Sequence, residues 1–186
     1  MSAKQEFIDI FKENIKRPGS EKLLEWLSQS DFFIAPASTK YHSAFEGGLV
    51  QHSLNVYKLL KKRCAEYGIT DGESIAICGL LHDICKANFY KASTRNVKNE
   101  ETGKWEQVPF YTIKEEFPYG SHGGKSVYLM LAHGLQLTDE EAAAINCHMG
   151  GWDYTTYHNP SNAFEKYPLA VYLHTADMLA TYINKC

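Results

Sequence analysis

The segment from Glu73 to Cys85 constrains the fold more than any other part of the chain, because it is apolar on nearly every side. A helix of that kind is buried in the middle of a domain rather than laid on its surface. Most other segments repeat apolar residues at helical spacing. The pattern therefore predicts an all-α fold, a helical bundle packed around residues 73–85.

Other helices are expected on both sides of this segment. Pro18-Gly19 ends the first of them, and Ser20 is expected to cap the next. Thr138 and Glu141 form a capping-box pattern before a later helix. Apolar spacing places the remaining boundaries only approximately. The expected helices cover residues 7–15, 20–27, 49–67, 73–85, 122–133, 138 onward and 164–183.

Residues from about 90 to 116 follow a different pattern. Polar and apolar side chains alternate from Lys104 to Ile113, and Glu101-Thr-Gly103 can turn the chain. We expect a small β-hairpin insertion here, with Pro109 confining the second strand to an edge. The sequence shows no internal repeat and no linker that would separate a second domain. We therefore expect residues 1–186 to form a single domain.

Composition excludes several classes of protein. The formal net charge is −3 and no long run of Lys or Arg appears, which argues against a protein that grips long nucleic acid. No stretch approaches the ~18 apolar residues of a membrane span, and the N-terminus does not resemble a signal peptide. The five cysteines form no CxxC pair. We expect a cytoplasmic protein with reduced thiols, and the sequence leaves its oligomeric state open.

The dipeptide His82-Asp83 lies at the end of the most apolar segment. The two side chains are about 100° apart on a helix, so both can reach one site at its edge. Lys86 falls on the same side, three residues after Asp83. A carboxylate buried without a partner costs several kcal/mol, and a metal ion would remove that penalty. The alternative is a surface pair between Asp83 and Lys86 at a helix end.

Further histidine and carboxylate side chains could complete a metal site. His52 is near the start of the helix that follows Gly47-Gly48, and Asp177 lies beside an apolar stripe of the last helix. His122 and His148 each stand next to glycine at a helix end, where His122 can instead cap a helix and His148 can satisfy a backbone carbonyl. A mixture of imidazole and carboxylate donors suits a borderline or hard divalent ion.

The order His52, His82-Asp83, Asp177 resembles the HD-domain phosphohydrolase superfamily, whose members carry these residues on separate helices of an all-α fold. The segments Tyr41-His42-Ser-Ala-Phe-Glu-Gly-Gly-Leu-Val-Gln-His52 and Leu-Leu-His82-Asp83-Ile-Cys-Lys86 strengthen the resemblance. It extends to small stand-alone HD hydrolases of bacteria and phages. It also extends to the HD module of a bacterial 3′–5′ exoribonuclease, whose OB-fold has no counterpart in these residues.

The resemblance implies a ligand set. His52, His82, Asp83 and Asp177 would bind a first divalent ion, which could be Mn, Fe, Mg, Ni, Co or Zn. Members with two ions add histidines between the His-Asp pair and the final Asp, and the motif aspartate bridges the ions. His122 and His148 fit that order. Cys85 departs from the glycine often found in His-Asp-x-Gly-Lys versions of the motif, without removing a ligand.

The resemblance also implies a reaction, the hydrolysis of a phosphate ester. Asp83 would steer the attacking water, Lys86 and Lys125 would balance charge on the phosphoryl oxygens, and whichever of His122 and His148 is not a ligand would protonate the leaving oxygen. The expected substrate is a small phosphorylated compound, a nucleotide by analogy with the family. The choice between a phosphomonoester and a phosphodiester stays open.

Two more residues are expected near the substrate, His42 as a phosphate contact and Trp152 as part of the pocket wall. One alternative function is a non-catalytic HD module that senses a nucleotide. Another is a structural metal site, which is disfavoured because structural zinc sites are usually rich in thiolates and the chain has no paired cysteines.

Overall fold

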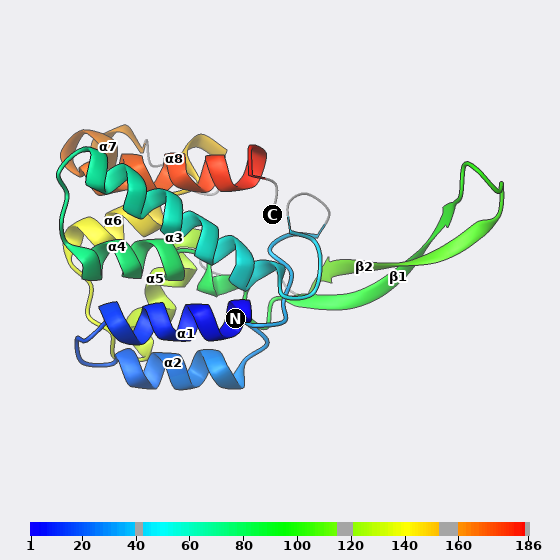
Figure 1. The fold of residues 1–186 in the computed structure, drawn as a ribbon, viewed down its shortest axis with the longest axis horizontal. Coiled ribbons are helices and arrows are strands. Elements are labelled where there is room, and N and C mark those ends of the chain that lie inside the picture. The colour runs from blue at the N-terminus through cyan, green and yellow to red at the C-terminus, as the bar shows by residue number, and fades with distance from the viewer. Residues whose placement is uncertain (40–42, 115–120, 153–159, 185–186) are drawn as a thin grey trace.

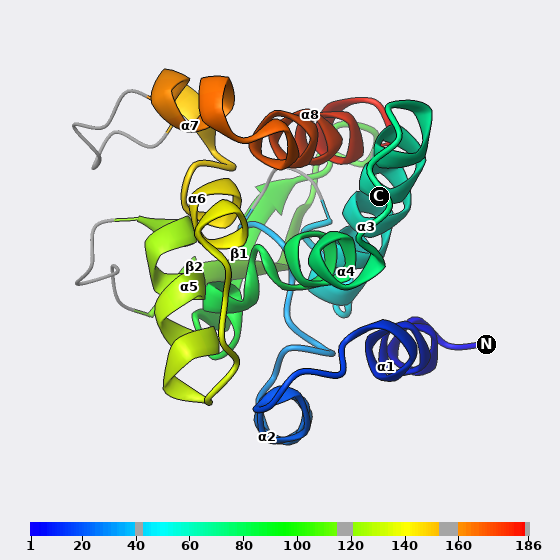
Figure 2. The same ribbon diagram turned by 90° about the vertical axis from the view of Figure 1, so that its left-hand side faces the viewer.

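Helix α4 (Gly72–Leu81) lies at the centre of the computed structural model, and its side chains are buried from Ser74 to Leu81. Asp71 begins the helix, because its carboxylate accepts hydrogen bonds from the backbone amides of Glu73 and Ser74. Helices from both ends of the chain surround α4 (Figure 2). The apolar composition of this segment therefore reflects its central position, as the sequence predicted.

The structure describes residues 1–39, 43–114, 121–152 and 160–184. In these ranges, eight α-helices form a bundle and two strands form a hairpin (Figure 1). The predicted helical bundle with a small hairpin insertion is confirmed. Besides α4, the elements are α1 (Ala3–Asn14), α2 (Ser20–Gln29), α3 (Gly48–Glu66), η1 (Ile84–Lys86), β1 (Tyr90–Lys98), β2 (Trp105–Ile113), α5 (His122–Ala132), α6 (Asp139–Asn146), η2 (Gly150–Trp152), α7 (Ser161–Lys166) and α8 (Pro168–Tyr182), where η is a 3₁₀ turn.

The contacts among the helices decide which segments can share a site. Helix α4 packs against α1, α3, α6 and α8, and α3 also packs along α8. Helix α5 contacts α6 and the η1 turn that follows α4. The end of α4 is therefore the place where α3, α5, α6 and α8 can all contribute side chains. None of the helices within the described ranges is long and apolar enough to cross a membrane.

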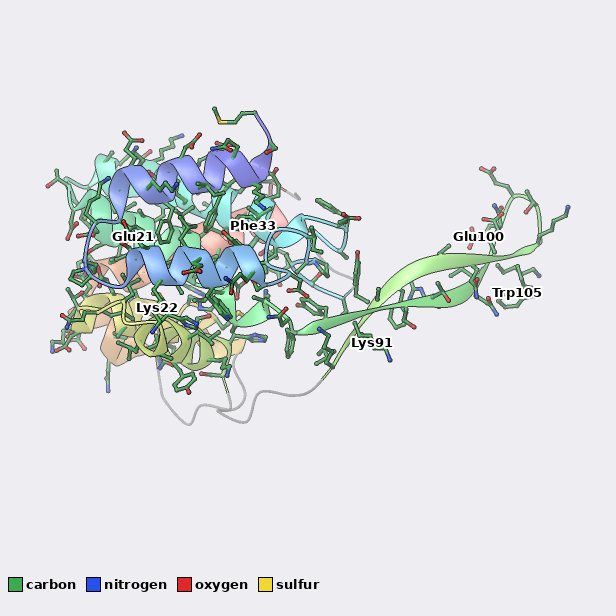
Figure 3. The ribbon with its side chains drawn as sticks, turned by 90° about the horizontal axis from the view of Figure 1, so that it is seen from below. Glu21, Lys22, Phe33, Lys91, Glu100 and Trp105 are labelled. Carbon is green, nitrogen blue, oxygen red and sulfur yellow. The ribbon has the colours of Figure 1, made fainter. Side chains whose placement is uncertain are left out.

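The hairpin projects from the bundle as an arm (Figure 1). Its strands pair antiparallel from Tyr90 opposite Ile113 to Lys98 opposite Trp105. Figure 3 shows Lys91 near the base of the arm and Trp105 near its tip. The indole of Trp105 is 70% exposed, whereas Tyr90 is buried at the root and donates a hydrogen bond from its hydroxyl to the carbonyl of Ala37. Within the described residues, the arm is therefore anchored to the bundle at its root.

Three predicted helix boundaries were wrong. The N-cap of α2 is Gly19, not Ser20. Gly19 has a left-handed backbone conformation, and a side chain at this position would collide with the backbone of Gly134. The helix expected over residues 73–85 ends at Leu81, and the chain then tightens into η1. The helix expected over 164–183 is broken at Pro168, which has no amide hydrogen and forces Tyr167 into an extended conformation. The capping box of Thr138 and Glu141 is confirmed.

Candidate metal centre

Three helices bring the four residues expected around a first ion to one point. His52 lies on the second turn of α3, His82 and Asp83 directly follow α4, and Asp177 lies on α8. The side chains of His52 and His82 are fully buried and that of Asp83 is 3% exposed. Asp177 is 15% exposed, so it is the most accessible of the four side chains.

The donor atoms of His52, His82 and Asp177 lie close enough to share one cation, and Asp83 lies beside the two histidines. His52 Nε2 is 3.3 Å from His82 Nε2 and 3.1 Å from Asp177 Oδ1. Asp83 Oδ2 is 3.5 Å from His82 Nε2 and 3.7 Å from His52 Nε2. The ligand atoms of His52, His82 and Asp177 all lie within 4.8 Å of one another. This spacing suits donors that surround a single divalent ion.

His148 joins the cluster from the end of α6. Its Nε2 lies 3.6 Å from Asp83 Oδ1, and the donors of His82, Asp83 and His148 form a second group within 4.8 Å. Its Nδ1 donates a hydrogen bond of 2.6 Å to the carbonyl of Ile145. His82 Nδ1 likewise donates to the carbonyl of Gly79, at 3.1 Å. Because a carbonyl only accepts, each Nδ1 carries a hydrogen, and in the neutral form of each ring the lone pair of Nε2 points into the cluster.

Two buried atoms of this cluster lack a hydrogen-bond partner among the described residues. They are Asp83 Oδ1 and His148 Nε2. Their separation of 3.6 Å is too long for a hydrogen bond between them. A buried polar atom without a partner costs roughly 1–3 kcal/mol. A cation between the two would satisfy both, so the residues present fit a divalent metal ion.

Charges in the cluster favour the forms that bind a cation. Burial lowers the pKa of His82 to about 4, so its ring is neutral at pH 7. Burial alone would raise the pKa of Asp83, but Lys86, then His82 and His148, hold it well below its ordinary value. Burial also opposes the ionised form of Asp177, whose pKa is lowered by the adjacent His52 and then by the other histidines. Two carboxylates are therefore ionised, and both lie near the neutral ring of His82.

Lys86 is buried and paired with Asp83. Its Nζ lies 2.6 Å from Asp83 Oδ2. Burial opposes the charged form of Lys86, but the carboxylate of Asp83 raises its pKa above the ordinary value. Burial would also lower the pKa of His148, and Asp83 raises it instead.

Gly79 allows α3 and α4 to pack closely, which brings His52 and His82 together. A Cβ on Gly79 would lie 2.6 Å from the Cα of Tyr57, so α3 and α4 touch through the bare backbone here. His52 precedes Tyr57 on α3 and His82 follows Gly79 on α4. The close approach of the helices thus sets the 3.3 Å separation of the two Nε2 atoms.

We expect Gly79→Ala to lower the free energy of unfolding by about 2 kcal/mol, as overpacking does, and to weaken metal binding by moving α3 away from α4. Gly72→Ala on the same helix is the matched control, because a Cβ there would meet only Asn14 Oδ1, at 3.7 Å. Urea unfolding and equilibrium dialysis with Mn²⁺ measure the two effects. Equal stability of the two variants would show that the contact does not set the spacing.

His122 and Cys85 form the other edge of the cluster. His122 is the first residue of α5, and its Nδ1 lies 3.8 Å from Cys85 Sγ. The donors of Asp83, Cys85 and His122 make a third group within 4.8 Å. Gly123 permits this arrangement, since a Cβ there would lie 2.2 Å from the carbonyl oxygen of Ile145. Burial raises the pKa of Cys85 to about 12, so without a cation its thiol stays protonated.

The structure describes only part of the set of residues expected near the substrate. Lys125 lies on α5 with its ammonium 5.0 Å from the centre of the Tyr128 ring. The backbone of Trp152 belongs to η2, shortly after His148, and its side chain lies outside the described part of the structure. His42 also lies outside the described residues. The substrate contacts of these residues therefore stay predictions.

His174 contributes to the site although its sequence context gave no reason to select it. Its Nδ1 donates a 2.6 Å hydrogen bond to the backbone carbonyl of His148, and its ring stacks on Phe164. His174 precedes Asp177 by three residues on α8, so both side chains lie on one face of that helix. This spacing was the signal available in the sequence.

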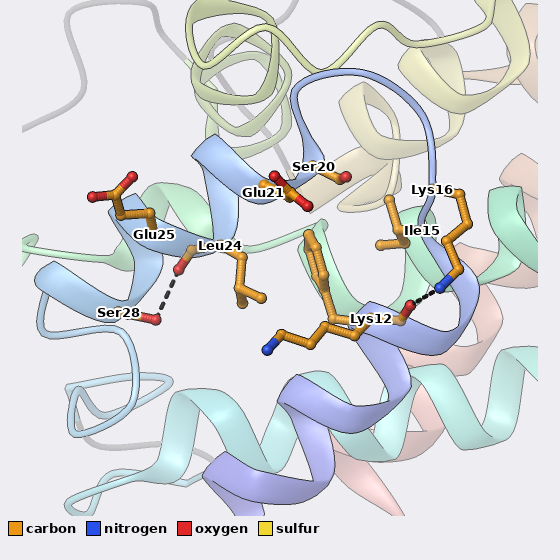
Figure 4. A pocket seen from close by; sticks show the side chains of 9 residues that line it. Lys12, Ile15, Lys16, Ser20, Glu21, Leu24, Glu25 and Ser28 are labelled. Atoms are coloured by element: carbon orange, nitrogen blue, oxygen red, sulfur yellow. Dashed lines mark hydrogen bonds between the residues drawn. The ribbon is translucent and has the colours of Figure 1, made fainter.

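A separate groove of about 730 Å³ runs between α1 and α2 (Figure 4). Phe11 and Leu24 belong to its apolar lining, and Lys12 and Glu21 add charge. None of the candidate ligands lines it. The groove is therefore not part of the metal centre.

Comparison with known proteins is consistent with this geometry. The sequence profile of the HD domain matches residues 49–182, a range that contains all six candidate metal ligands. A stretch of 61 residues is 39% identical to the dihydroneopterin 2′,3′-cyclic phosphate phosphodiesterase of Methanocaldococcus jannaschii. That stretch covers 30% of this chain and 24% of the relative, so the match spans about a quarter of that protein. No solved structure matches the chain.

Proposed function

This chain belongs to the HD-domain family, and from that premise we propose that it is a metal-dependent phosphohydrolase acting on a small phosphate ester. One observation carries the proposal: buried imidazole and carboxylate donors from α3, α4 and α8 lie within 4.8 Å of one another. Such a cluster is costly to bury unless a cation completes it.

We assign His52, His82, Asp83 and Asp177 to a first ion, with Asp83 and one or both of His122 and His148 extending the donor set toward a second. A divalent ion held there would polarise a phosphoryl oxygen and make an attacking water more acidic. The neutral rings of His82 and the ionised carboxylate of Asp83 are already in the forms that ligate. These two ligands therefore need no change of protonation to accept the ion.

The other side chains of the site would position and balance charge. Lys86 holds Asp83 ionised through the 2.6 Å contact, and its positive charge favours the negative phosphoryl oxygens of a substrate. Lys125, on the same helix as His122, would add to that charge. The leaving oxygen takes its proton from whichever of His122 and His148 is not ligating. Asp177, the more exposed carboxylate, lies on the side from which substrate would enter.

For the substrate we propose a nucleotide, with a 2′,3′-cyclic phosphodiester as the first candidate. The activity named for the partly matching relative, a 2′,3′-cyclic phosphate phosphodiesterase, supports the diester. The absence of a long basic run in the sequence favours a small substrate over long nucleic acid.

Removal of metal is expected to abolish hydrolysis, and its return to restore it. The purified chain is treated with a chelator, dialysed, and assayed with Mn²⁺, Mg²⁺, Ni²⁺, Co²⁺, Fe²⁺ or Zn²⁺. The substrates are nucleoside 2′,3′- and 3′,5′-cyclic phosphates, nucleoside monophosphates and short oligonucleotides. We expect at least one ion to restore turnover of a cyclic nucleotide. Turnover confined to non-nucleotide phosphates would refute the nucleotide assignment, and tight nucleotide binding without turnover would favour a sensing module.

A further inference from the structure

Cys85 is a buried cysteine that lies beside a candidate metal-binding histidine. It is 3% exposed, and its Sγ lies 3.8 Å from Nδ1 of His122. The same sulfur, His122 and a carboxylate oxygen of Asp83 all lie within 4.8 Å of one another. In the sequence, Cys85 stood out only as a departure from a glycine. In the structure it is one of three neighbouring residues whose donor atoms are spaced so that they could hold a metal ion.

The fold holds this group in place from two sides. Cys85 belongs to η1, which packs against α5. Its backbone amide donates a 3.2 Å hydrogen bond to the hydroxyl of Ser126, a fully buried residue of α5. His122 lies four residues before Ser126 and thus on the same face of α5. The bond to Ser126 therefore fixes Cys85 opposite His122.

Asp83 supplies a separate indication that the cluster holds more than one ligand. Its Oδ2 is used by Lys86, at 2.6 Å, whereas its Oδ1 is buried and lacks a hydrogen-bond partner within the described part of the chain. Asp83 is also the residue that this group shares with the group of His82 and His148. A carboxylate with one oxygen free can bridge two neighbouring cations.

We propose that Cys85 is a metal ligand, and that Asp83, Cys85 and His122 bind a thiophilic divalent ion beside the first one. This inference rests on the proposed function, because the two positions share Asp83. On binding, the thiol releases its proton to solvent and the thiolate forms the bond to the ion. Thiolate and imidazole donors favour Zn²⁺, Co²⁺ or Fe²⁺ over Mg²⁺ or Mn²⁺. The thiolate thus makes the second position selective for softer ions than the first.

X-ray absorption spectroscopy of the full chain loaded with Zn²⁺ tests this directly. We expect a sulfur neighbour at about 2.3 Å from zinc, together with nitrogen and oxygen neighbours. The Co²⁺-loaded protein should show a charge-transfer band from sulfur to cobalt. Cys85→Ala should lose both signals and bind one ion fewer. Cys64→Ala is the matched control, since Cys64 is also fully buried but lies at the far end of α3 from His52, and it should keep both signals.

The wild-type spectrum shows whether sulfur ligates the zinc, even where a variant fails to fold. Zinc bound by nitrogen and oxygen alone would overturn the role of Cys85 and leave the proposed function standing. Failure of the wild-type chain to bind any of these ions would overturn both. A sulfur signal that persists in Cys85→Ala would assign the ligand to another cysteine and refute the inference. Mn²⁺ binding at the first position should change less than about tenfold in Cys85→Ala.

Discussion

Replacing Asp83 with asparagine is expected to abolish stable metal binding and to reduce phosphate-ester hydrolysis by at least about a thousandfold. Asp83 is the centre of the cluster, because one carboxylate oxygen faces Lys86, His82 and His52 while the other faces His148. Asparagine keeps the shape but removes the negative charge that a divalent ion requires. Equilibrium dialysis with Mn²⁺ and a cyclic-nucleotide assay measure the two losses.

Asp71→Asn is the matched control for this change. Asp71 caps the opposite end of the same helix, and asparagine caps helices about as well as aspartate. Its metal content and turnover should therefore equal those of the wild type. Circular dichroism must show that the Asp83 variant is folded, because Lys86 loses its carboxylate partner there. Wild-type metal content and turnover in a folded Asp83→Asn protein would refute the ligand assignment.

The second large effect is on stability and is expected from Arg17→Met. The guanidinium of Arg17 makes two hydrogen bonds to Glu141, at 2.8 and 3.0 Å. The side chain of Glu141 is fully buried and also accepts hydrogen bonds from the hydroxyl of Ser74 and the backbone amide of Thr138. Removing Arg17 leaves a buried carboxylate without its countercharge, which costs about 3 kcal/mol. The melting temperature should fall by roughly 10 °C, as measured by circular dichroism.

An arginine-to-methionine substitution at an exposed ion pair is the control for Arg17→Met. Arg63 lies 3.1 Å from Glu66, and both side chains are more than 40% exposed. Arg63→Met should cost less than about 0.5 kcal/mol, because solvent screens such a pair. Arg17→Met should retain its bound metal, since Arg17 and Glu141 take no part in the cluster. Similar losses of stability in the two variants would contradict a special role for the buried pair.

The sequence predicted the parts of the fold that depend on local pattern. The buried central helix followed from the apolar run after Asp71, and the hairpin followed from alternation around a turn at Gly103. Pro168 itself indicates a helix break, but we predicted one continuous helix over residues 164–183. The end of α4 at Leu81 could not be predicted from the sequence, because a long-range hydrogen bond from the Cys85 amide to the Ser126 hydroxyl holds the η1 turn.

The candidate site divides in the same way. The order of His52, His82-Asp83 and Asp177 suggested a shared cluster, and the structure brings these side chains together. The contacts of Cys85 with His122 and of His174 with the His148 carbonyl depend on how α5 and α8 pack. Packing of that kind joins residues far apart in the chain. Periodicity in the sequence shows only which residues share a helix face, as the spacing of His174 and Asp177 does.

The most direct test of the account is X-ray diffraction at the cobalt absorption edge from crystals of the Co²⁺-loaded chain. Side chains from α3, α4 and α8 should surround one cation. We therefore predict an anomalous peak for a cobalt ion that is coordinated by His52, His82, Asp83 and Asp177. A peak elsewhere on the protein, with no density among these four side chains, would contradict the account.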